Sequence, residues 1–355
     1  MSSPVKSLPA SWYSDPDLFS REQSLIFAQH WSYVAPETEL ELPGDCLAAE
    51  IAARSIILVR GEDNQIKGFY NLCRHRASPL IRDEPVNVKR IVCPYHSWCY
   101  DLAGNLISAP GFKESDDFKL NKLGLISIRV ECWNGMVFAC LDTDAPSLIE
   151  WLGDVVDIAK DFAAVDDMDY ESRLVNKGDV NWKCYSDNTA EGYHLASVHP
   201  GLAASLVSKQ TSIRAYKRGQ FVGFDVTYKG KDGVPESSGF WVYKYPGLLL
   251  HFSMNSFNVE RVIPLSPTRS RMERSFWFKP EISSIQRNAT VAFSNIVMDE
   301  DLEICLRVQK NLQSGVYETG FLSPEREPGT IFFQQLVADS LKDRRMSNIR
   351  EYRQQ

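Results

Sequence analysis

Residues 73–98 read CRHRASPLIRDEPVNVKRIVCPYHSW. Two pairs of possible metal ligands lie in this stretch, Cys73 with His75 and Cys93 with His96, and 17 residues separate the pairs. Each pair is short enough to lie on one loop tip, where it offers one thiolate and one imidazole. The stretch therefore predicts a metal site that is built from two loops.

The order of these ligands bears on the kind of metal. Zinc fingers usually pair like ligands, with two cysteines followed by two histidines. A [2Fe–2S] cluster with mixed ligands binds both thiolates to one iron and both imidazoles to the other, and one Cys and one His on each loop suit that arrangement. Two interpretations stay open beside it: a zinc site, and core cysteines with unrelated surface histidines.

The surrounding sequence is rich in short strand patterns. The predicted strands cover residues 46–51, 55–60, 66–71, 89–92, 124–129 and 135–139. Residues 61–64 and 103–105 supply the turns between strands. We therefore expect an all-β domain over residues 43–150, with both ligand pairs in loops between its strands.

Composition excludes several classes of partner. The chain has 355 residues, 44% of them apolar, and a formal net charge of −7. This acidity argues against nucleic acid or an anionic membrane as a main partner. No apolar run approaches the roughly 18 residues of a membrane span, and no secretory signal is visible. The eight cysteines do not suggest a disulfide scaffold in a chain of this length, so we expect a cytoplasmic location.

The rest of the chain predicts a second domain. Residues 1–42 are expected to form a helical segment that packs on it, with Asp15 or Asp17 as the helix cap. Further helices are predicted at residues 147–165, 290–313 and 332–341, and strands at 170–177, 221–228, 240–245, 248–253, 258–264 and 271–278. Strands followed by helices, without βαβ alternation, indicate a mainly antiparallel sheet over residues 151–355 and an α+β protein overall.

A second group of possible ligands lies in residues 181–200, which read NWKCYSDNTAEGYHLASVHP. On a helix, Asp187, Glu191 and His194 would share one face. His199 would lie roughly 140° further round an ideal helix than His194. The two imidazoles can therefore share a metal only if the helix loosens or ends between them. Two unrelated surface histidines are the usual alternative.

The predicted helix at 290–313 carries one carboxylate in an unusual place. Its apolar residues at helical spacing are Val297, Ile304, Cys305, Val308 and Leu312. Asp301 falls near the centre of this stripe, where a carboxylate is costly unless it is paired or bound to a metal. Asp299 and Glu303 fall on the opposite side and Glu300 lies off the edge, so these three fit a solvated run of charge.

Both groups of residues resemble motifs of one protein family. C-x-H-x17-C-x2-H followed by Ser97-Trp98 resembles the cluster motif of the Rieske non-haem iron oxygenases, although family members usually carry Gly at position 97. N-W-K-x3-D-N-x2-E-x-Y-H-x4-H over residues 181–199 resembles the mononuclear iron motif of the same family. The run from Glu300 to Cys305 resembles its late carboxylate segment. The chain thus resembles a catalytic α subunit of this family.

The resemblance implies a fold and a role for each candidate residue. It implies a helix-grip (START-like) catalytic domain with a long C-terminal helix. The implied cluster ligands are Cys73, His75, Cys93 and His96, and the implied iron ligands are His194, His199 and Asp301. Glu191 would link His194 to His96 of the partner subunit. Asp187 and Asn188 would orient ligands, with helix solvation and capping as their alternative role.

The implied cofactors are a Rieske [2Fe–2S] cluster and a mononuclear Fe(II), with O2 as co-substrate. The sequence contains no G-x-G-x-x-G dinucleotide motif, so electrons from NAD(P)H would arrive through a partner reductase. That partner would be a flavin and iron–sulfur reductase, acting directly or through a ferredoxin. A homotrimer is implied because the electron path in this family crosses a subunit boundary.

The substrate class also rests on resemblance. Many aromatic-ring dioxygenases have Asp where this chain has Glu191, and residues 308–312 resemble relatives that act on choline, carnitine and betaines. We expect hydroxylation or oxidative N-demethylation of a small quaternary-ammonium compound. Aromatic-ring hydroxylation is the alternative within the family, and a non-catalytic Rieske electron-transfer protein is the alternative outside it. His30 and His251 have no partner pattern, and we interpret both as structural.

Overall fold

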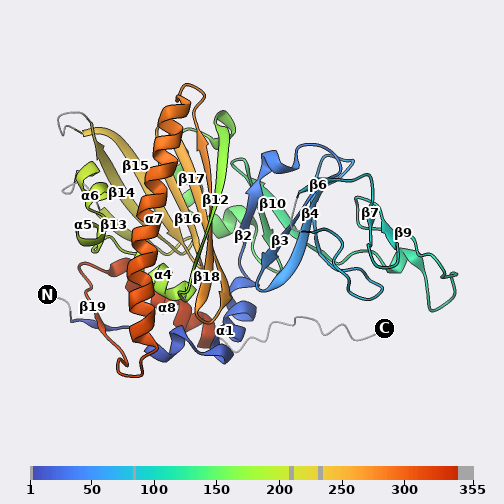
Figure 1. Ribbon diagram of the computed structural model, residues 1–355, viewed down its shortest axis with the longest axis horizontal. Coiled ribbons are helices and arrows are strands. Elements are labelled where there is room, and N and C mark those ends of the chain that lie inside the picture. The colour runs from blue at the N-terminus through green and yellow to red at the C-terminus, as the bar shows by residue number, and fades with distance from the viewer. Residues whose placement is uncertain (1–2, 83–84, 208–211, 231–234, 343–355) are drawn as a thin grey trace.

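The computed structural model describes residues 3–82, 85–207, 212–230 and 235–342. The molecule is elongated, with a β-rich unit at one end of its long axis and a larger sheet crossed by one long helix at the other (Figure 1). The predicted α+β class is therefore confirmed. Residues 1–2 and 343–355 of the expected terminal segments lie outside the described part of the chain.

The β-rich unit consists of two antiparallel sheets. The larger has the order β2-β11-β10-β5-β4-β3-β6. Its strands are β2 (Ser32–Pro36), β3 (Asp45–Ile51), β4 (Arg54–Arg60), β5 (Ile66–Tyr70), β6 (Val86–Asn87), β10 (Ser127–Trp133) and β11 (Met136–Cys140). The smaller sheet contains β7 (Ile91–Val92), β8 (Cys99–Tyr100) and β9 (Leu106–Ser108). The strands predicted at 46–51, 55–60 and 66–71 are confirmed within one residue, whereas β10 begins three residues later than predicted.

The N-terminal segment is only partly helical. Asp15 caps α1 (Pro16–Glu22), and a π-helical turn over Gln23–Phe27 continues it. The prediction of a helical segment up to residue 42 is wrong for residues 32–36, which form β2 and pair with β11 in the β-rich unit. Residues 33–35 are all buried, and a short, continuous apolar run gives no periodicity that separates strand from helix.

The larger unit is built on a seven-stranded antiparallel sheet of order β12-β18-β17-β16-β15-β14-β13. Its strands are β12 (Asp169–Gly178), β13 (Ser212–Tyr216), β14 (Phe221–Lys229), β15 (Pro235–Lys244), β16 (Leu248–Ser253), β17 (Ser256–Ser266) and β18 (Arg269–Phe278). The helix α7 (Ser284–Leu312) lies across this sheet (Figure 1), which is the helix-grip arrangement that the resemblance implied. All six strands that were predicted for this sheet are confirmed, and of its seven strands only the edge strand β13 was not predicted.

The remaining helices frame this sheet. They are α2 (Leu148–Leu152), α3 (Val155–Ala159), α4 (Trp182–Thr189), α5 (Leu195–Val198), α6 (Pro200–Ser205) and α8 (Pro328–Lys342). The single helix predicted at 147–165 is broken between α2 and α3, because Gly153 has a left-handed φ of 61° and a Cβ there would lie 2.6 Å from the backbone of Gly219. No helix in the described ranges is long and apolar enough to cross a membrane.

The helix α7 begins six residues before its predicted start. Ser283 and Gln286 form a capping box, in which each side chain bonds to the backbone of the other residue. This motif satisfies N–H groups that the first turn of a helix leaves free. At the other end of the chain, β1 (Val5–Lys6) pairs with β19 (Phe321–Leu322) and ties the N-terminus to the larger unit.

A buried ion pair joins the N-terminal segment to α4. Glu22 accepts hydrogen bonds from Nζ of Lys183, 2.5 Å, and from Nε1 of Trp182, 2.7 Å. Both members of the ion pair have side chains without solvent exposure. A buried charge that loses its partner is strongly destabilising, so this contact holds the start of α4 in place.

A second buried charge lies on β18. The Glu273 side chain is 7% exposed and contacts three guanidinium groups, those of Arg173, Arg261 and Arg271. Burial raises the pKa of Glu273, but the three guanidiniums outweigh burial and lower it to about 2. The carboxylate is therefore charged at neutral pH and binds β12, β17 and β18 together.

Candidate metal centres and active site

The first candidate centre lies between two loops of the β-rich unit. Cys73 and His75 lie in the loop after β5, and Cys93 and His96 lie in the turn between β7 and β8. In both loops the backbone N–H four residues after the Cys donates to the Cys carbonyl oxygen, at 2.9 Å and 3.0 Å. The residue at this position has a left-handed φ in both loops, and in the second it is Ser97. Glycine tolerates this conformation best. This explains why the Rieske motif usually carries Gly at the position of Ser97.

The geometry of these side chains fits a [2Fe–2S] cluster. The rings of His75 and His96 lie 4.6 Å apart between centroids. Both Nδ1 atoms are buried and lack a hydrogen-bond partner among the described residues. The thiols of Cys73 and Cys93 are also buried, and neither forms a disulfide. Buried imidazole nitrogens are costly without a partner, and two of them beside two thiols match mixed ligation of a Rieske cluster.

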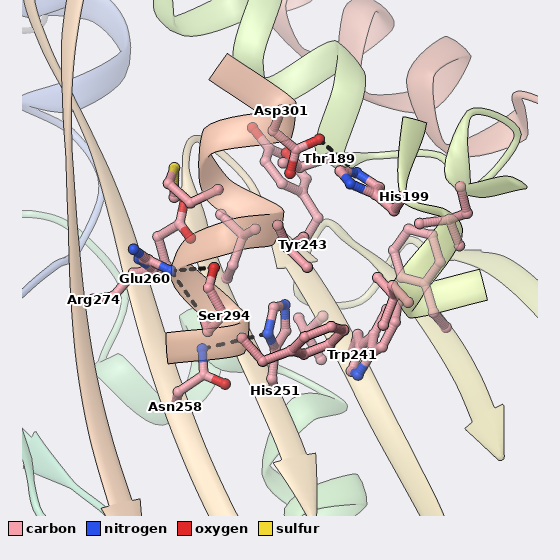
Figure 2. Close-up of a pocket in the computed structure, with 18 of the residues that line it drawn as sticks. Thr189, His199, Trp241, Tyr243, His251, Asn258, Glu260, Arg274, Ser294 and Asp301 are labelled. Carbon is pink, nitrogen blue, oxygen red and sulfur yellow. Dashed lines mark hydrogen bonds and ion pairs between the residues drawn. The ribbon is translucent and has the colours of Figure 1, made fainter. Parts of the chain in front are cut away.

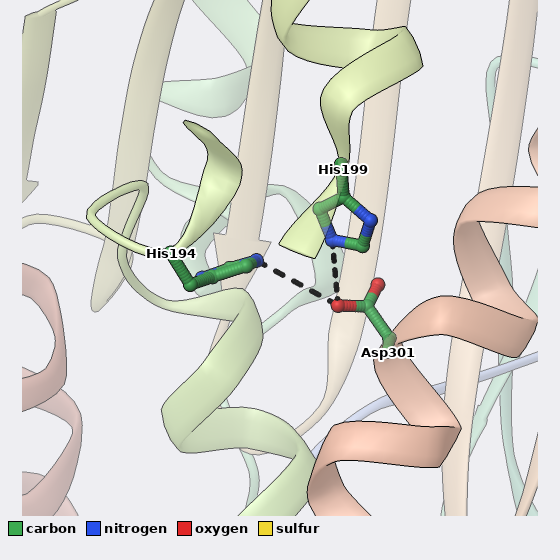
Figure 3. A group of neighbouring side chains, drawn as sticks. All are labelled: His194, His199 and Asp301. Atoms are coloured by element: carbon green, nitrogen blue, oxygen red, sulfur yellow. Dashed lines mark hydrogen bonds and ion pairs between the residues drawn. The ribbon is translucent and has the colours of Figure 1, made fainter. Parts of the chain in front are cut away.

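The second candidate centre brings together three residues from distant parts of the chain. His199 Nε2 lies 2.9 Å from Oδ1 of Asp301, and His194 Nε2 lies 3.6 Å from the same oxygen (Figure 3). One ligand atom from each residue lies within 4.8 Å of the others. Two imidazoles and one carboxylate on one side of a metal are the ligand set of non-haem Fe(II) oxygenases. An iron held there would activate O2 at the coordination positions that the protein leaves open.

The local fold explains how His194 and His199, five residues apart, can both reach one metal. The expectation that Asp187, Glu191 and His194 share a helix face is wrong, because α4 ends at Thr189. His194 begins the one-turn helix α5 and His199 ends it, where the next helix starts at a proline. The chain therefore bends around the site, and both imidazoles point to Asp301 on α7 (Figure 3).

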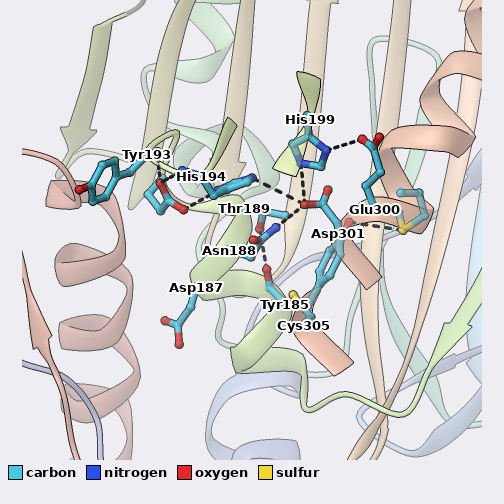
Figure 4. Close-up of polar contacts among 12 residues, drawn as sticks. Tyr185, Asp187, Asn188, Thr189, Tyr193, His194, His199, Glu300, Asp301 and Cys305 are labelled. Carbon is cyan, nitrogen blue, oxygen red and sulfur yellow. Dashed lines mark hydrogen bonds and ion pairs between the residues drawn. The ribbon is translucent and has the colours of Figure 1, made fainter. Parts of the chain in front are cut away.

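Three polar side chains orient these candidate ligands (Figure 4). Oε1 of Glu191 lies 2.5 Å from Nδ1 of His194. Nδ2 of Asn188 donates to Oδ1 of Asp301 at 2.5 Å. Oε2 of Glu300 lies 2.7 Å from Nδ1 of His199. Such outer contacts set the orientation and basicity of metal ligands. The expectation that Glu300 is only part of a solvated charge run is therefore wrong.

Asp187 lies on the far side of α4 from this centre (Figure 4). Its carboxylate accepts from Tyr13 Oη at 2.5 Å and from Gln334 Nε2 at 2.8 Å. Burial raises its pKa to about 7, although both hydrogen bonds lower it. In the structure it contacts none of the three candidate iron ligands, so any effect on the iron must pass through the position of α4.

A cavity of about 380 Å³ adjoins the second centre. His194, His199 and Asp301 line one side of it, and the inner face of the sheet forms the opposite side (Figure 2). The sheet contributes aromatic and polar side chains, among them Tyr228, Trp241, Phe252, His251 and Glu260. His251, which we expected to be only structural, is part of this wall. The volume suits a small organic substrate beside the iron.

The fold and the two centres define a class of protein, the oxygenase component of a Rieske non-haem iron oxygenase. The chain belongs to the family of ring hydroxylating alpha subunits, whose catalytic domain matches residues 161–343. The Rieske [2Fe-2S] domain matches residues 30–131. The resident cofactors are accordingly a Rieske cluster and a mononuclear iron, as predicted.

Named relatives match this chain over different lengths. The carnitine monooxygenase oxygenase subunit of Escherichia coli (strain K12) is 29% identical over 352 residues, 95% of this chain and 94% of that protein. The large oxygenase component of the 2,4-dinitrotoluene dioxygenase system of Burkholderia sp. (strain RASC) is 33% identical over 198 residues, 54% of this chain and 44% of that protein. A crystal structure of the quaternary ammonium Rieske monooxygenase CntA with L-carnitine matches with a TM-score of 0.83 and 26% identity, over 95% of this chain and 96% of that one.

Proposed function

We propose that this chain oxidises a small quaternary-ammonium compound with O2, by hydroxylation or oxidative N-demethylation. In this proposal residues 43–150 form the electron-transfer domain, to which β2 adds an edge strand, and residues 151–355 form the catalytic domain. The cluster ligands are Cys73, His75, Cys93 and His96, and the mononuclear iron ligands are His194, His199 and Asp301. Asn188 and Glu191 position those ligands, and Asp187 positions α4.

The observation that carries the substrate class is sequence identity over almost the whole chain, which carnitine and choline monooxygenases show at 29% and 27%, whereas a naphthalene 1,2-dioxygenase structure of equal coverage is 18% identical and shares the fold alone. The carnitine monooxygenase subunit matches 95% of the chain, which includes the sheet that forms the cavity wall. The glycine betaine monooxygenase subunit and the dinitrotoluene dioxygenase component match only 57% and 54% of the chain, so these partial matches favour neither substrate class. Aromatic-ring hydroxylation remains the second candidate, because aromatic side chains in the cavity also suit a planar substrate.

We further propose a homotrimer fed by a partner reductase. The strand β7, which precedes the loop of Cys93 and His96, lies towards one end of the long axis, and α5 lies towards the other (Figure 1). The two candidate centres thus lie towards different ends of one chain, which favours electron transfer between chains over transfer within one chain. The contact of Glu191 with Nδ1 of His194 supports a route from His96 of the partner subunit through Glu191 to the iron. NAD(P)H would supply electrons through a flavin and iron–sulfur reductase, directly or through a ferredoxin.

Metal content and turnover test these proposals. Purified protein is expected to show a Rieske-type EPR signal and about three irons per chain, two in the cluster and one mononuclear. His194→Ala should lose the single iron and keep the cluster signal. Two irons in the wild type, with no effect of His194→Ala on iron content or turnover, would favour the non-catalytic electron-transfer alternative.

The substrate is tested with the reductase supplied. NADH consumption and formaldehyde release are measured with carnitine, choline, glycine betaine and a set of aromatic acids. The proposal predicts coupled turnover with at least one quaternary-ammonium compound. Coupled turnover with aromatic acids alone would replace the proposal by its second candidate.

A further inference from the structure

Glu260 is a buried carboxylate in the wall of the cavity. The residue lies on β17 and is 3% exposed. Its Oε1 accepts a hydrogen bond from the hydroxyl of Tyr185 on α4, 2.7 Å. Figure 2 shows it beside Arg274, to the left of and below Asp301 and His199, and all four residues line the cavity. A ligand in the cavity beside the iron would therefore lie near Glu260. Glu260 itself contacts none of the candidate iron ligands.

The strand register explains why this carboxylate faces the cavity. Trp241 on β15, His251 on β16 and Asn258 on β17 are direct cross-strand neighbours. Glu260 lies two residues after Asn258, and side chains two residues apart in a strand point to the same face. Glu260 therefore belongs to the same inner face as the aromatic side chains, one row further along the sheet.

Glu260 has no paired cation in the described part of the chain. Its cross-strand neighbour is Arg274 on β18, but no ion pair forms between the two side chains. Both Nη atoms of Arg274 point to other acceptors. Nη1 donates to the carbonyl and hydroxyl oxygens of Ser294, both at 2.7 Å, and Nη2 donates to the side chains of Asn176 and Asn295, both at 2.9 Å.

Burial without a paired cation disfavours the charged form of the Glu260 carboxyl group and raises its pKa. Burial is the main cause that raises the pKa of Glu260 to about 7, and the charge of Asp301 on α7 adds to it. Arg274 and the Tyr185 hydroxyl lower it, but not enough to restore an ordinary value. A positive ligand charge in the cavity would favour the ionised form.

Another part of the same wall is aromatic and uncharged. Nε1 of Trp241 donates to the hydroxyl of Tyr228, 3.0 Å, which fixes both rings. The ring of His251 lies 5.5 Å from that of Trp241 between centroids. Burial lowers the pKa of His251 to about 4, so its imidazole is neutral at pH 7. Faces of aromatic rings attract quaternary ammonium groups, and no positive charge from His251 opposes this.

We propose that Glu260 is the residue that selects for a permanent positive charge in the substrate, by facing the quaternary nitrogen that Trp241 and Tyr228 hold by their ring faces. This inference rests on the proposed function, since it assigns the recognition of the quaternary ammonium group to one side chain. It makes Glu260 a specificity residue that acts in binding. The reaction at the iron does not require it.

A pair of matched ligands tests the role of charge. The ligands are choline and its tert-butyl analogue, in which carbon replaces the nitrogen and the positive charge is lost while the shape is kept. Glycine betaine and carnitine, with their tert-butyl analogues, form further pairs. Dissociation constants are measured anaerobically on the holoenzyme by calorimetry, for wild type, Glu260→Gln and the surface control Glu303→Gln, whose residue lies outside the cavity.

Glu260→Gln keeps the size of the side chain and an acceptor for the Tyr185 hydroxyl. We expect it to weaken binding of the cation roughly 10- to 100-fold, as for loss of a charged partner, and to change binding of the neutral analogue by less than about threefold. Glu303→Gln should change neither. A merely structural role would weaken both ligands alike, and the intensity of the Rieske EPR signal and the unfolding midpoint report whether the variant folds.

The two proposals fail in different ways. If the wild type binds a cation more tightly than its neutral analogue and Glu260→Gln keeps that preference, the role of Glu260 is refuted and the substrate class stands. If the wild type binds none of the quaternary-ammonium compounds, the proposed substrate class is refuted and the role of Glu260 falls with it. Equal loss of both ligands in a folded Glu260→Gln variant would also refute selection by charge.

Discussion

The contact between Glu300 and His199 yields a quantitative prediction for iron binding. Glu300→Gln removes the negative charge that lies 2.7 Å from Nδ1 of His199 and leaves an amide of the same shape. Loss of such an outer contact usually costs 10- to 100-fold in metal affinity, or about 1.4–2.8 kcal/mol. Because the Glu300 side chain is 32% exposed, solvent screens part of its charge, and we expect about a tenfold loss.

The assay separates the two iron centres. The mononuclear iron is removed with a mild chelator, and Fe(II) is titrated back anaerobically in competition with a coloured chelator. The Rieske EPR signal is integrated in the same samples and should stay constant. Glu303→Gln is the matched control, since Glu303 lies on the same helix with its side chain 65% exposed and pairs with Arg307 at the surface.

If Glu300→Gln and Glu303→Gln bind Fe(II) with the same affinity as wild type, the contact with His199 has no role in holding the metal. A loss of iron in both variants would instead indicate a general effect of helix charge. Only a selective loss in Glu300→Gln supports the contact as the cause.

Three further predictions concern turnover and stability. Glu191→Gln should retain both metal centres and reduce substrate-dependent NADH oxidation by roughly tenfold or more; normal turnover would reject its bridging role. Glu273 has a pKa of about 2 against an ordinary 4.5, so it stabilises the fold above pH 4.5 and this contribution is lost as the pH falls towards 2. Glu273→Gln should therefore lower the free energy of unfolding by ~3 kcal/mol at pH 7 and flatten its pH dependence below 4.5, as followed by urea unfolding; an unchanged acid limb would count against the guanidinium contacts. Glu22→Ala leaves the buried Lys183 unpaired and should cost ~3–5 kcal/mol in the same assay, whereas Asp157→Ala in an exposed pair should leave stability unchanged; equal effects of both would show that burial of the pair is not decisive.

The amino-acid sequence indicated two metal sites, and the family resemblance supplied their chemistry. Each pair of proposed cluster ligands lies within one tight turn, so residues that are close in the sequence are also close in the structure. Asp301 was also found from the sequence, because helical periodicity places it in a buried stripe, and it is 7% exposed in the structure. The same periodicity predicted that Val308 is buried, and this is wrong because Val308 is 42% exposed. Helical periodicity shows which residues share a face, but it does not show how much of that face other elements cover.

Which polar groups surround the candidate metal ligands can be seen only in the folded structure. Glu300 looked like a solvated charge because its partner His199 is 101 residues away, and no local pattern contains that contact. Asp187 and Glu191 were expected on one helix face, but α4 ends at Thr189, and Glu191 contacts His194 whereas Asp187 contacts Tyr13 and Gln334.

Glu260 gave no signal in the sequence, because strand alternation marks it as inward-facing only once the register with Arg274 and the packing of α4 and α7 are known. A ligand pair in a turn is a local property of the chain. The charge that a buried carboxylate meets depends on every element packed around it, and that is a property of the folded molecule.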